Sequence, residues 1–437
     1  MPEIEKPKVG AIIKLTIDRL SIGGRGVGRF GPWVVFIPET IAGEEVEAKI
    51  SKVKKNYLEA QLLGVLRRSE FRIEPPCPIA GKCGGCGWQH IEYSEQLRQK
   101  FLLVKEAMTK FSGLGEEEIG NLVQKVIPSP SEFRYRNRIQ VHVSGERIGY
   151  HARGTNNLIE IKDCLIAEEG LSARLKTLGV ELMQSRDRRS SVFTKQNRQR
   201  RIELFRTEQG IVDWREESGS FGREAGEQGT TSLFEGNLFS QVNQGQNLRL
   251  IAYVTELCRS LVVESGLTKI YDLYSGNGNF TFPILEALSI QAVAVEINQK
   301  STEIANSKSL QKGMGDRLEI QCSDVAEFLA SNAIHKEEFV LLDPPRTGCD
   351  PKVLSSLLGW DGWGDNDRSD EDMISKNKGS KGSTGPGAIV YVSCHPVTLA
   401  RDLKILLGDG KYRVRSLQPF DMFPQTDHVE VVAVLVR

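Results

Sequence analysis

Cysteine and acidic side chains follow several short apolar segments of this chain, and these residue types can do chemistry. Cys394 lies just past the carboxyl end of the apolar run 388–392, which is rich in β-branched and aromatic residues, is bounded by glycine and proline, and is typical of a buried strand. In open α/β sheets, ligands bind and reactions occur at the carboxyl ends of the strands. A thiol at that position is a candidate nucleophile, although cysteine is also a residue that often only packs in a core.

Acidic residues stand at or near the carboxyl ends of the apolar segments that precede this one. Four acids occupy such positions: Asp272, Glu296, Asp324 and Asp343. Glu296 lies twenty residues after Gly276 of a glycine turn, where a carboxylate can accept hydrogen bonds from both hydroxyls of a ribose. An acid at position 324 can bind an adenine amino group. Each acid alone is more often a helix cap, but acids after four successive strands, with Cys394 after the fifth, predict a ligand site at this edge.

A second group of cysteines lies in the first half of the chain. Cys77, Cys83 and Cys86 have C-x5-C-x2-C spacing with glycines between them. Either Cys164 or His90 can supply a fourth ligand. Four thiolates suit tetrahedral zinc or an iron–sulfur cluster, and the spacing does not choose between them. A redox pair of Cys83 and Cys86 is the alternative, but it leaves Cys77 unexplained.

The composition narrows the class of protein. The chain has 437 residues, with 57 Lys plus Arg and 57 Asp plus Glu, so the net charge is zero and any basic surface must be local. No apolar run of membrane-spanning length occurs, and the first ten residues lack the apolar core of a signal peptide. These features predict a cytoplasmic protein of two or three domains that does not act in a membrane. In such a chain the eight cysteines favour metal or catalytic thiols over disulfides.

The elements that would position these residues change along the chain. Residues 9–66 alternate strand-like segments with glycine turns, which predicts a small β-barrel, either of the oligonucleotide-binding kind or a structural cap. Residues 95–111 have the apolar spacing of a helix. From about residue 231 strands and helices alternate, which predicts a doubly wound, mostly parallel sheet whose last two strands pair antiparallel. The segment 361–387 is of low complexity, and we expect a disordered surface insertion there.

Two segments carry basic side chains suited to RNA. Arg134, Arg136 and Arg138 flank Tyr135 at the head of a strand, and residues 186–201 hold seven basic residues against one acidic. Arginine and aromatic side chains together hold phosphates and stack bases. A solvated strand face and a surface loop are the alternatives to RNA contacts.

These motifs together resemble the S-adenosylmethionine-dependent RNA uracil-5-methyltransferases. The resemblance covers nearly the whole chain and rests on DLYSGNGNF, LLDPPRTG, VSCHPVTLARDL, DMFPQTDHVEVV, FSQVNQGQN at 239–247 and the cysteine segment CPIAGKCGGCGWQH. The amino-terminal barrel is similar to a TRAM domain. Two features depart from the family: His395 stands where asparagine is common, and the 361–387 insertion is unusual.

The resemblance implies a division of the chain into three domains. It implies a TRAM domain, an OB-like β-barrel that binds RNA, at 1–66, and an α/β class I methyltransferase domain at 231–437. Between them, residues 67–230 are expected to form a central α+β domain with a four-iron four-sulfur cluster. The cluster ligands that the resemblance implies are Cys77, Cys83, Cys86 and Cys164.

The resemblance also implies the roles of the site residues. Cys394 adds to carbon 6 of a flipped-out uracil, which makes carbon 5 nucleophilic, and Glu430 removes the carbon 5 proton after methylation. Without the resemblance, Glu430 reads as an exposed strand carboxylate. The residues that match family positions around S-adenosylmethionine are Gln241, Tyr274, Asn279, Glu296, Asp324 and Asp343.

The expected substrate is 23S ribosomal RNA, with transfer RNA as the alternative, and we expect a monomer. Two other classes of protein explain less of the sequence. A nicotinamide-dependent dehydrogenase needs a third glycine in the turn after the first strand and leaves Cys394 and Glu430 without a role. A non-catalytic RNA-binding iron–sulfur protein leaves the acids at the strand ends unexplained.

Overall fold

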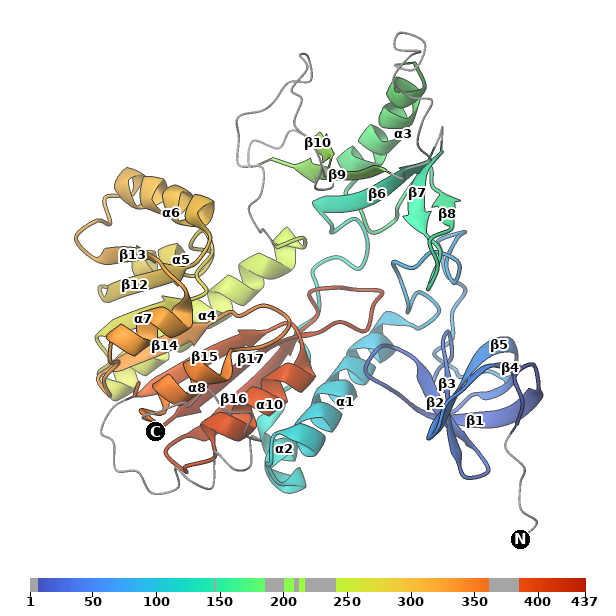
Figure 1. Cartoon of the computed structure of the whole chain (residues 1–437), viewed down its shortest axis with the longest axis horizontal. Helices are drawn as coiled ribbons and strands as arrows, with labels where there is room; N and C mark the ends of the chain where they lie inside the picture. Colours follow the sequence, from blue (N-terminus) through green and yellow to red (C-terminus); the bar gives the residue numbers. More distant parts are fainter. Residues whose placement is uncertain (1–6, 145–146, 185–199, 208–211, 217–240, 361–384) are drawn as a thin grey trace.

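Three sheets organise the part of the chain that the structure describes (Figure 1). The structure is a computed structural model, and it describes residues 7–144, 147–184, 200–207, 212–216, 241–360 and 385–437. The basic run 186–201 and the insertion 361–387 lie largely outside these residues. None of the described helices combines the length and the apolar composition that crossing a bilayer requires.

The first sheet closes into a barrel in the order β1-β2-β3-β5-β4. Its strands are β1 Ile12–Leu20, β2 Gly26–Phe30, β3 Trp33–Ile37, β4 Glu45–Val53 and β5 Tyr57–Arg67. Buried and exposed residues alternate along β1, so Ile13, Leu15 and Ile17 point into the barrel. There they pack with Val46 and Leu58 in one apolar core. The barrel predicted from the alternating segments of residues 9–66 is confirmed.

The second sheet is antiparallel and has the order β10-β9-β6-β7-β8. Its strands are β6 Arg138–Ser144, β7 Arg147–His151, β8 Leu158–Glu160, β9 Arg200–Arg206 and β10 Val212–Glu216. Helix α3 (Glu169–Gln184) covers one face, and its Leu171 and Leu175 pack with Val141 of β6. This unit stands above the other two in Figure 1.

The third sheet is the largest and has the order β13-β12-β11-β14-β15-β17-β16. Its strands are β11 Lys269–Leu273, β12 Gln291–Glu296, β13 Leu318–Cys322, β14 Glu338–Leu342, β15 Ala388–Ser393, β16 Arg413–Phe420 and β17 Glu430–Val436. The strands from β11 to β15 run parallel, and β17 is antiparallel to both β15 and β16. The predicted doubly wound sheet with an antiparallel final pair is confirmed.

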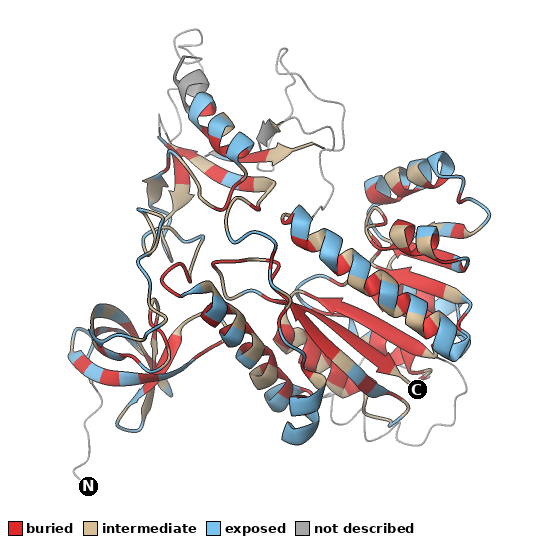
Figure 2. Cartoon of the chain, turned by 180° about the vertical axis from the view of Figure 1, so that it is seen from behind, coloured by how far each residue is buried: buried red, intermediate tan, exposed pale blue. Residues whose placement is uncertain are grey.

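Helices cover both faces of this sheet, and Figure 2 shows its strands as buried and the outer faces of the helices as exposed. The helices are α4 Gln244–Ser265, α5 Thr281–Ala287, α6 Gln299–Gln311, α7 Val325–Ser331, α8 Pro351–Leu357 and α10 Pro396–Leu406. Every residue of β15 is buried. A strand that is buried along its whole length belongs at the centre of a parallel sheet, where both faces are covered.

Residues 93–127 also pack on the large sheet, although the sequence places them in the range 67–230. Helix α1 (Tyr93–Phe111) confirms the helix predicted for 95–111 and lies against α10. Its Val104 and Met108 belong to the core of the large sheet. After α2 (Glu116–Leu122), Val123 pairs with Leu417 of β16. The division into domains at 1–66, 67–230 and 231–437 stays a prediction. In the structure, residues 93–127 of the second range pack on the sheet of the third.

Candidate active site

The strand registers bring three of the six predicted cofactor residues to one edge of the large sheet. β11 pairs in parallel with β12 and β14, and the paired residues are level up to Leu273, the last residue of β11. Because parallel strands end at the same edge, the residues that follow emerge together. These residues are Tyr274 after β11, Glu296 at the end of β12 and Asp343 after β14.

The same edge holds Cys394 and Glu430 on neighbouring strands. Ser393, the last residue of β15, pairs with Val431 of the antiparallel strand β17. Continued by one position, this register sets Cys394 opposite Glu430, and the Glu430 carboxylate is one of the charges that act on the Cys394 thiol. Glu430 is only 2% exposed, so its interpretation as an exposed strand carboxylate is wrong. The register thus brings the predicted nucleophile next to the predicted base.

Opposing charges act on the thiol of Cys394. Burial and, next in size, the Glu430 carboxylate raise the pKa of Cys394 to about 11, whereas the Arg346 guanidinium lowers it. Arg346 is exposed and follows Asp343 and two prolines after β14. A positive charge favours the thiolate, which is the nucleophilic form of cysteine. Sequence patterns do not predict Arg346 as a site residue, and its one signal is its place three positions after the strand-end acid Asp343.

Two carboxyl groups next to the thiol have raised pKa values. Burial raises the pKa of Glu430 to about 7, and Arg346 only partly opposes this shift. Burial, then Glu430 and then Asp272, raise the pKa of Asp343 well above its usual range. A carboxyl group that titrates near neutral pH can accept a proton and release it again, as a general base must.

Glu296 and Tyr274 shape the turn at the end of β11. The Glu296 carboxylate accepts hydrogen bonds from the amides of Gly276 (3.0 Å) and Asn298 (2.7 Å). Tyr274 has a φ of 67°, a left-handed conformation that is uncommon for a residue with a side chain. Backbone strain of this kind persists where surrounding structure fixes it, often at ligand sites.

The other predicted cofactor residues have structural partners as well. Asp324 caps helix α7 by accepting from the amides of Ala326 (2.8 Å) and Glu327 (3.3 Å), as the helix-cap alternative predicts. The side-chain amides of Asn279 and Asn247 donate to each other at 3.2 and 2.9 Å. The half-buried Gln241 lies just before α4, and its carbonyl accepts from the Asn137 side chain at 3.2 Å.

His395, which replaces the asparagine common in the resembling family, is the N-cap of α10. Its ring Nδ1 accepts a hydrogen bond from the Thr398 amide at 3.4 Å. Asparagine is among the preferred N-cap residues because its side-chain oxygen accepts the same bond. The histidine therefore keeps the capping function beside Cys394.

The four predicted cluster cysteines are free, half-buried thiols. Burial raises the pKa of Cys86 to about 12, and the charges of Cys164, Cys83 and Cys77 add to that increase. The four thiols are therefore near one another. Their thiolate forms repel each other, and a bound cation would offset that repulsion. Within the residues that the structure describes, however, no three His, Cys, Asp or Glu side chains are arranged as a metal site. Four thiols are suitable ligands for an iron–sulfur cluster, but the described side chains are not arranged around a common centre as metal ligands are.

His90, the alternative fourth ligand, faces the barrel. Its Nε2 lies 3.5 Å from the carbonyl oxygen of Thr40. Burial and then Arg72 lower its pKa to about 4. Cys164, by contrast, is among the charges that raise the pKa of Cys86, and the choice between the two as a fourth ligand stays a prediction.

Arg134 acts inside the central unit. Its guanidinium binds both carboxylate oxygens of Asp163 at 2.9 and 2.8 Å and donates to the carbonyls of Cys164 (3.0 Å) and Ala167 (3.2 Å). Arg138 lies 3.6 Å from Glu203. These contacts hold the segment that carries Cys164, and the RNA contact expected of these arginines stays a prediction.

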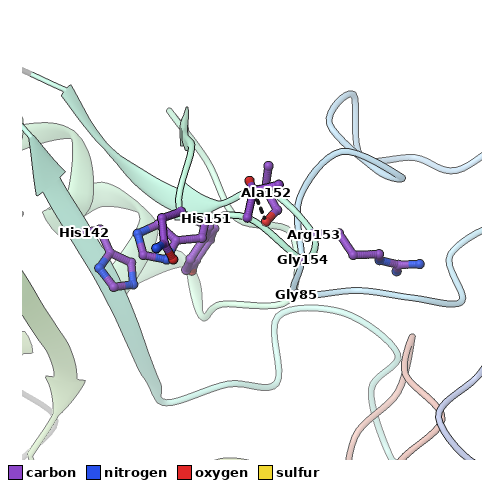
Figure 3. A pocket seen from close by; sticks show the side chains of 10 residues that line it. Gly85, His142, His151, Ala152, Arg153 and Gly154 are labelled. Carbon is purple, nitrogen blue, oxygen red and sulfur yellow. Dashed lines mark hydrogen bonds between the residues drawn. The ribbon is translucent and has the colours of Figure 1, made fainter. Parts of the chain in front are cut away.

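A cavity of about 510 Å³ lies against the cysteine segment. Gly84 and Gly85, which separate Cys83 from Cys86, line it. Figure 3 shows His142 and His151 side by side in its wall, with Arg153 directed away from them. The two imidazole rings are stacked with centroids 3.7 Å apart. None of the strand-edge residues lines this cavity, so it is separate from the site around Cys394.

Known proteins are similar to this chain in sequence and in fold. A TRAM domain model matches residues 6–63. An uncharacterized RNA methyltransferase of Bdellovibrio bacteriovorus is 36% identical over 435 residues, which cover 98% of this chain and 96% of that protein. One of Nostoc is 30% identical over 480 residues, with 98% and 96% covered.

Among solved structures, the fold is similar to that of the Pyrococcus abyssi tRNA (uracil-54, C5)-methyltransferase, crystallised with S-adenosyl-L-homocysteine. The TM-score is 0.64 at 21% identity, and the match covers 97% of this chain and 100% of that one. The likeness shows that the barrel, the central unit and the large sheet occur together in a methyltransferase fold.

Proposed function

The chain belongs to a family of RNA methyltransferases, and from this membership we propose that it methylates carbon 5 of a uridine in RNA. The observation that carries the proposal is the register that sets Cys394 opposite the buried Glu430 at the edge where the strand-end acids gather. A reaction at carbon 5 of uracil needs both a nucleophile and a base. Methylation of a nitrogen or a ribose hydroxyl needs no such cysteine.

Carbon 5 of uracil is a weak nucleophile, and Cys394 is the residue that activates it. The thiolate adds to carbon 6, which places negative charge on carbon 5 and the carbonyl oxygen. Arg346 favours the thiolate that starts this step. When bound, S-adenosylmethionine supplies the methyl group. Glu430 then takes the proton from carbon 5, and the electron pair of that bond expels the cysteine sulfur from carbon 6.

We propose that six residues hold S-adenosylmethionine at the turn after β11. They are Gln241, Tyr274, Asn279, Glu296, Asp324 and Asp343. Glu296 would accept hydrogen bonds from ribose hydroxyls in addition to those from the Gly276 and Asn298 amides. Asp324 uses one oxygen for its cap, which leaves the other for the adenine amino group.

We expect the substitution Glu296→Ala to weaken the binding of S-adenosylmethionine by about 1 to 3 kcal/mol, because two charge-assisted hydrogen bonds are lost. Isothermal titration calorimetry measures the change. The matched control is Glu303→Ala on the exposed face of α6, where a carboxylate of the same size is removed away from the turn. An unchanged affinity for Glu296→Ala in a folded protein would place the cofactor elsewhere.

We propose that Cys77, Cys83, Cys86 and Cys164 bind one four-iron four-sulfur cluster. Protein isolated without oxygen should then be brown and contain iron and sulfide, and Cys164→Ala should lose both. Cys322→Ala, which removes an exposed thiol outside the group, should keep them. Stoichiometric zinc with negligible iron would instead assign a zinc site.

Large-subunit ribosomal RNA is the proposed substrate, since a TRAM domain together with this cysteine segment resembles the family members that act on it. The test is to incubate the protein and S-adenosylmethionine with unmodified 23S ribosomal RNA and, separately, with unmodified transfer RNA. Mass spectrometry of the nucleosides should show 5-methyluridine in the ribosomal RNA alone. Product only in transfer RNA would correct the substrate, and no methylated uridine in either would contradict the function.

A further inference from the structure

The turn between β1 and β2 of the barrel, residues 21–25, contacts the loop between β16 and β17, residues 421–429. The Gly23 amide donates a hydrogen bond to Asp427 Oδ2 at 3.0 Å, across 404 positions of sequence. Gly24 has a φ of +71°, and a Cβ there would lie 3.2 Å from Asp427 Cβ and 3.0 Å from Trp88 Nε1. The turn therefore fits closely against both neighbours.

Trp88 joins this turn to the middle of the loop. Its side chain is completely buried, its Nε1 donates to the Gly24 carbonyl at 3.1 Å, and its amide donates to the Gln425 carbonyl at 3.0 Å. Gln425 has a φ of 69° and is itself buried. Reciprocal hydrogen bonds of 2.9 and 3.0 Å tie it to Gln96 of α1. An unfavourable backbone conformation held in this way depends on the groups that surround it.

A buried ion pair fixes the start of the loop. Lys100 Nζ of α1 lies 2.5 Å from Asp421 Oδ1, and both side chains are fully buried. Lys100 also donates to the Phe423 carbonyl at 3.0 Å. Two more loop carbonyls accept side-chain hydrogen bonds of 3.1 Å: Pro424 from Tyr135, and Met422 from Asn243. Partners outside the β16–β17 hairpin thus determine the shape of the loop.

The end of this loop borders the candidate nucleophile. Burial and then Arg346 lower the pKa of His395, whereas Asp427 raises it. Burial also lowers the pKa of His428, which Asp427 raises and Arg346 lowers. His395 is the residue after Cys394, and the exposed His428 precedes Glu430 by two positions. The loop segment that the barrel turn holds is therefore close to Cys394 and Glu430, where the uracil is proposed to react.

We propose that the β1–β2 turn and Trp88 hold loop 421–429 as a wall of the uridine pocket, so that the barrel is a structural part of the active site in addition to any RNA binding. This inference rests on the proposed function for the identity of the substrate. Gly24, Trp88 and Asp427 are positioning residues in this account. They act on the substrate through the loop.

The first test compares Gly24→Ala with Gly43→Ala in the full-length protein. Both glycines lie in barrel turns at positive φ, +71° and +87°, but an added Cβ at Gly43 meets nothing within 4 Å. Gly24→Ala should push Asp427 and Trp88 aside, lowering kcat/KM for RNA by roughly 10- to 100-fold through misplacement of the loop. The affinity for S-adenosylmethionine should not change. Gly43→Ala should match the wild type in kcat/KM.

Hydrogen exchange provides a readout that needs no catalysis. The Gln425 amide, bonded to Gln96, and the rest of the 421–430 segment should exchange faster in Gly24→Ala than in Gly43→Ala. This result would support the inference even if the RNA product proved different from 5-methyluridine. Equal exchange in the two variants would overturn the inference without affecting the proposed function.

The second test separates positioning from direct catalysis at Asp427. Asp427→Asn keeps an oxygen that accepts from the Gly23 amide, whereas Asp427→Ala removes it. We expect Asn to retain most of the kcat/KM for RNA and Ala to resemble Gly24→Ala in both kinetics and hydrogen exchange. If Asn is as defective as Ala while the loop stays protected, the carboxylate charge itself is needed and the positioning account is wrong.

Discussion

Cys394→Ala is expected to abolish methylation of RNA while the protein keeps its fold and its affinity for S-adenosylmethionine. Without the thiol nothing adds to carbon 6, so carbon 5 is never made nucleophilic, and the loss should be on the order of 10⁴-fold or more. Transfer of a radioactive methyl group to RNA measures the effect. Trapping with 5-fluorouridine RNA, from which no proton can be removed at carbon 5, should give a covalent complex with the wild type and none with the variant.

The matched control is Cys258→Ala, which removes a buried thiol of helix α4 that lies in the core of the large sheet. Its substitution should lower the stability of the fold through lost packing and leave the methylation rate close to that of the wild type. Residual methylation by Cys394→Ala at a rate near that of Cys258→Ala would remove Cys394 from the mechanism.

Glu430→Gln is expected to accumulate a covalent protein–RNA complex. Glutamine preserves the size of the side chain but cannot accept the carbon 5 proton, so the cysteine cannot leave after methylation. The complex should resist denaturation, require S-adenosylmethionine and contain the transferred methyl group. Gel electrophoresis under denaturing conditions detects it, and multiple turnover should fall by on the order of 10²- to 10⁴-fold.

The pH dependence of proton removal gives a second readout for Glu430. Because burial raises its pKa to about 7, the carboxylate form that acts as the base becomes populated as the pH rises through that value. The rate of product release should therefore increase from pH 6 to pH 8 in the wild type. Glu319→Gln, on the exposed face of β13, is the control that should keep both the pH profile and turnover. Normal turnover by Glu430→Gln would assign the base to another group.

Local sequence patterns were sufficient to predict the elements and the edge of the sheet that holds the site. The run 388–392 is apolar throughout, which is typical of a central parallel strand, and the structure places it there with Cys394 just beyond it. The alternation in residues 9–66 likewise predicted the barrel. In each case the signal lies within a few consecutive residues.

Local sequence patterns could not predict that Glu430 is buried. Its burial follows from the position of β17 between β15 and β16, a property of the whole sheet that the sequence of one strand does not carry. The contact between Lys100 and Asp421 joins residues 321 positions apart. Arg134 resembles a phosphate ligand in sequence, yet in the structure its guanidinium binds Asp163. Long-range pairings of this kind decide which charged side chains are free to meet a substrate.

The central claim is that the protein methylates carbon 5 of uridine through loss of the carbon 5 hydrogen. RNA that carries tritium at carbon 5 of its uridines tests this claim directly, because each methyl group gained must release one tritium to water. For the wild type we predict equal amounts of tritium released and methyl group transferred, and for Glu430→Gln we predict methyl transfer without release. Methylation of uridine that leaves the tritium in place in the wild-type reaction would contradict the account, since the methyl group would then be on another atom.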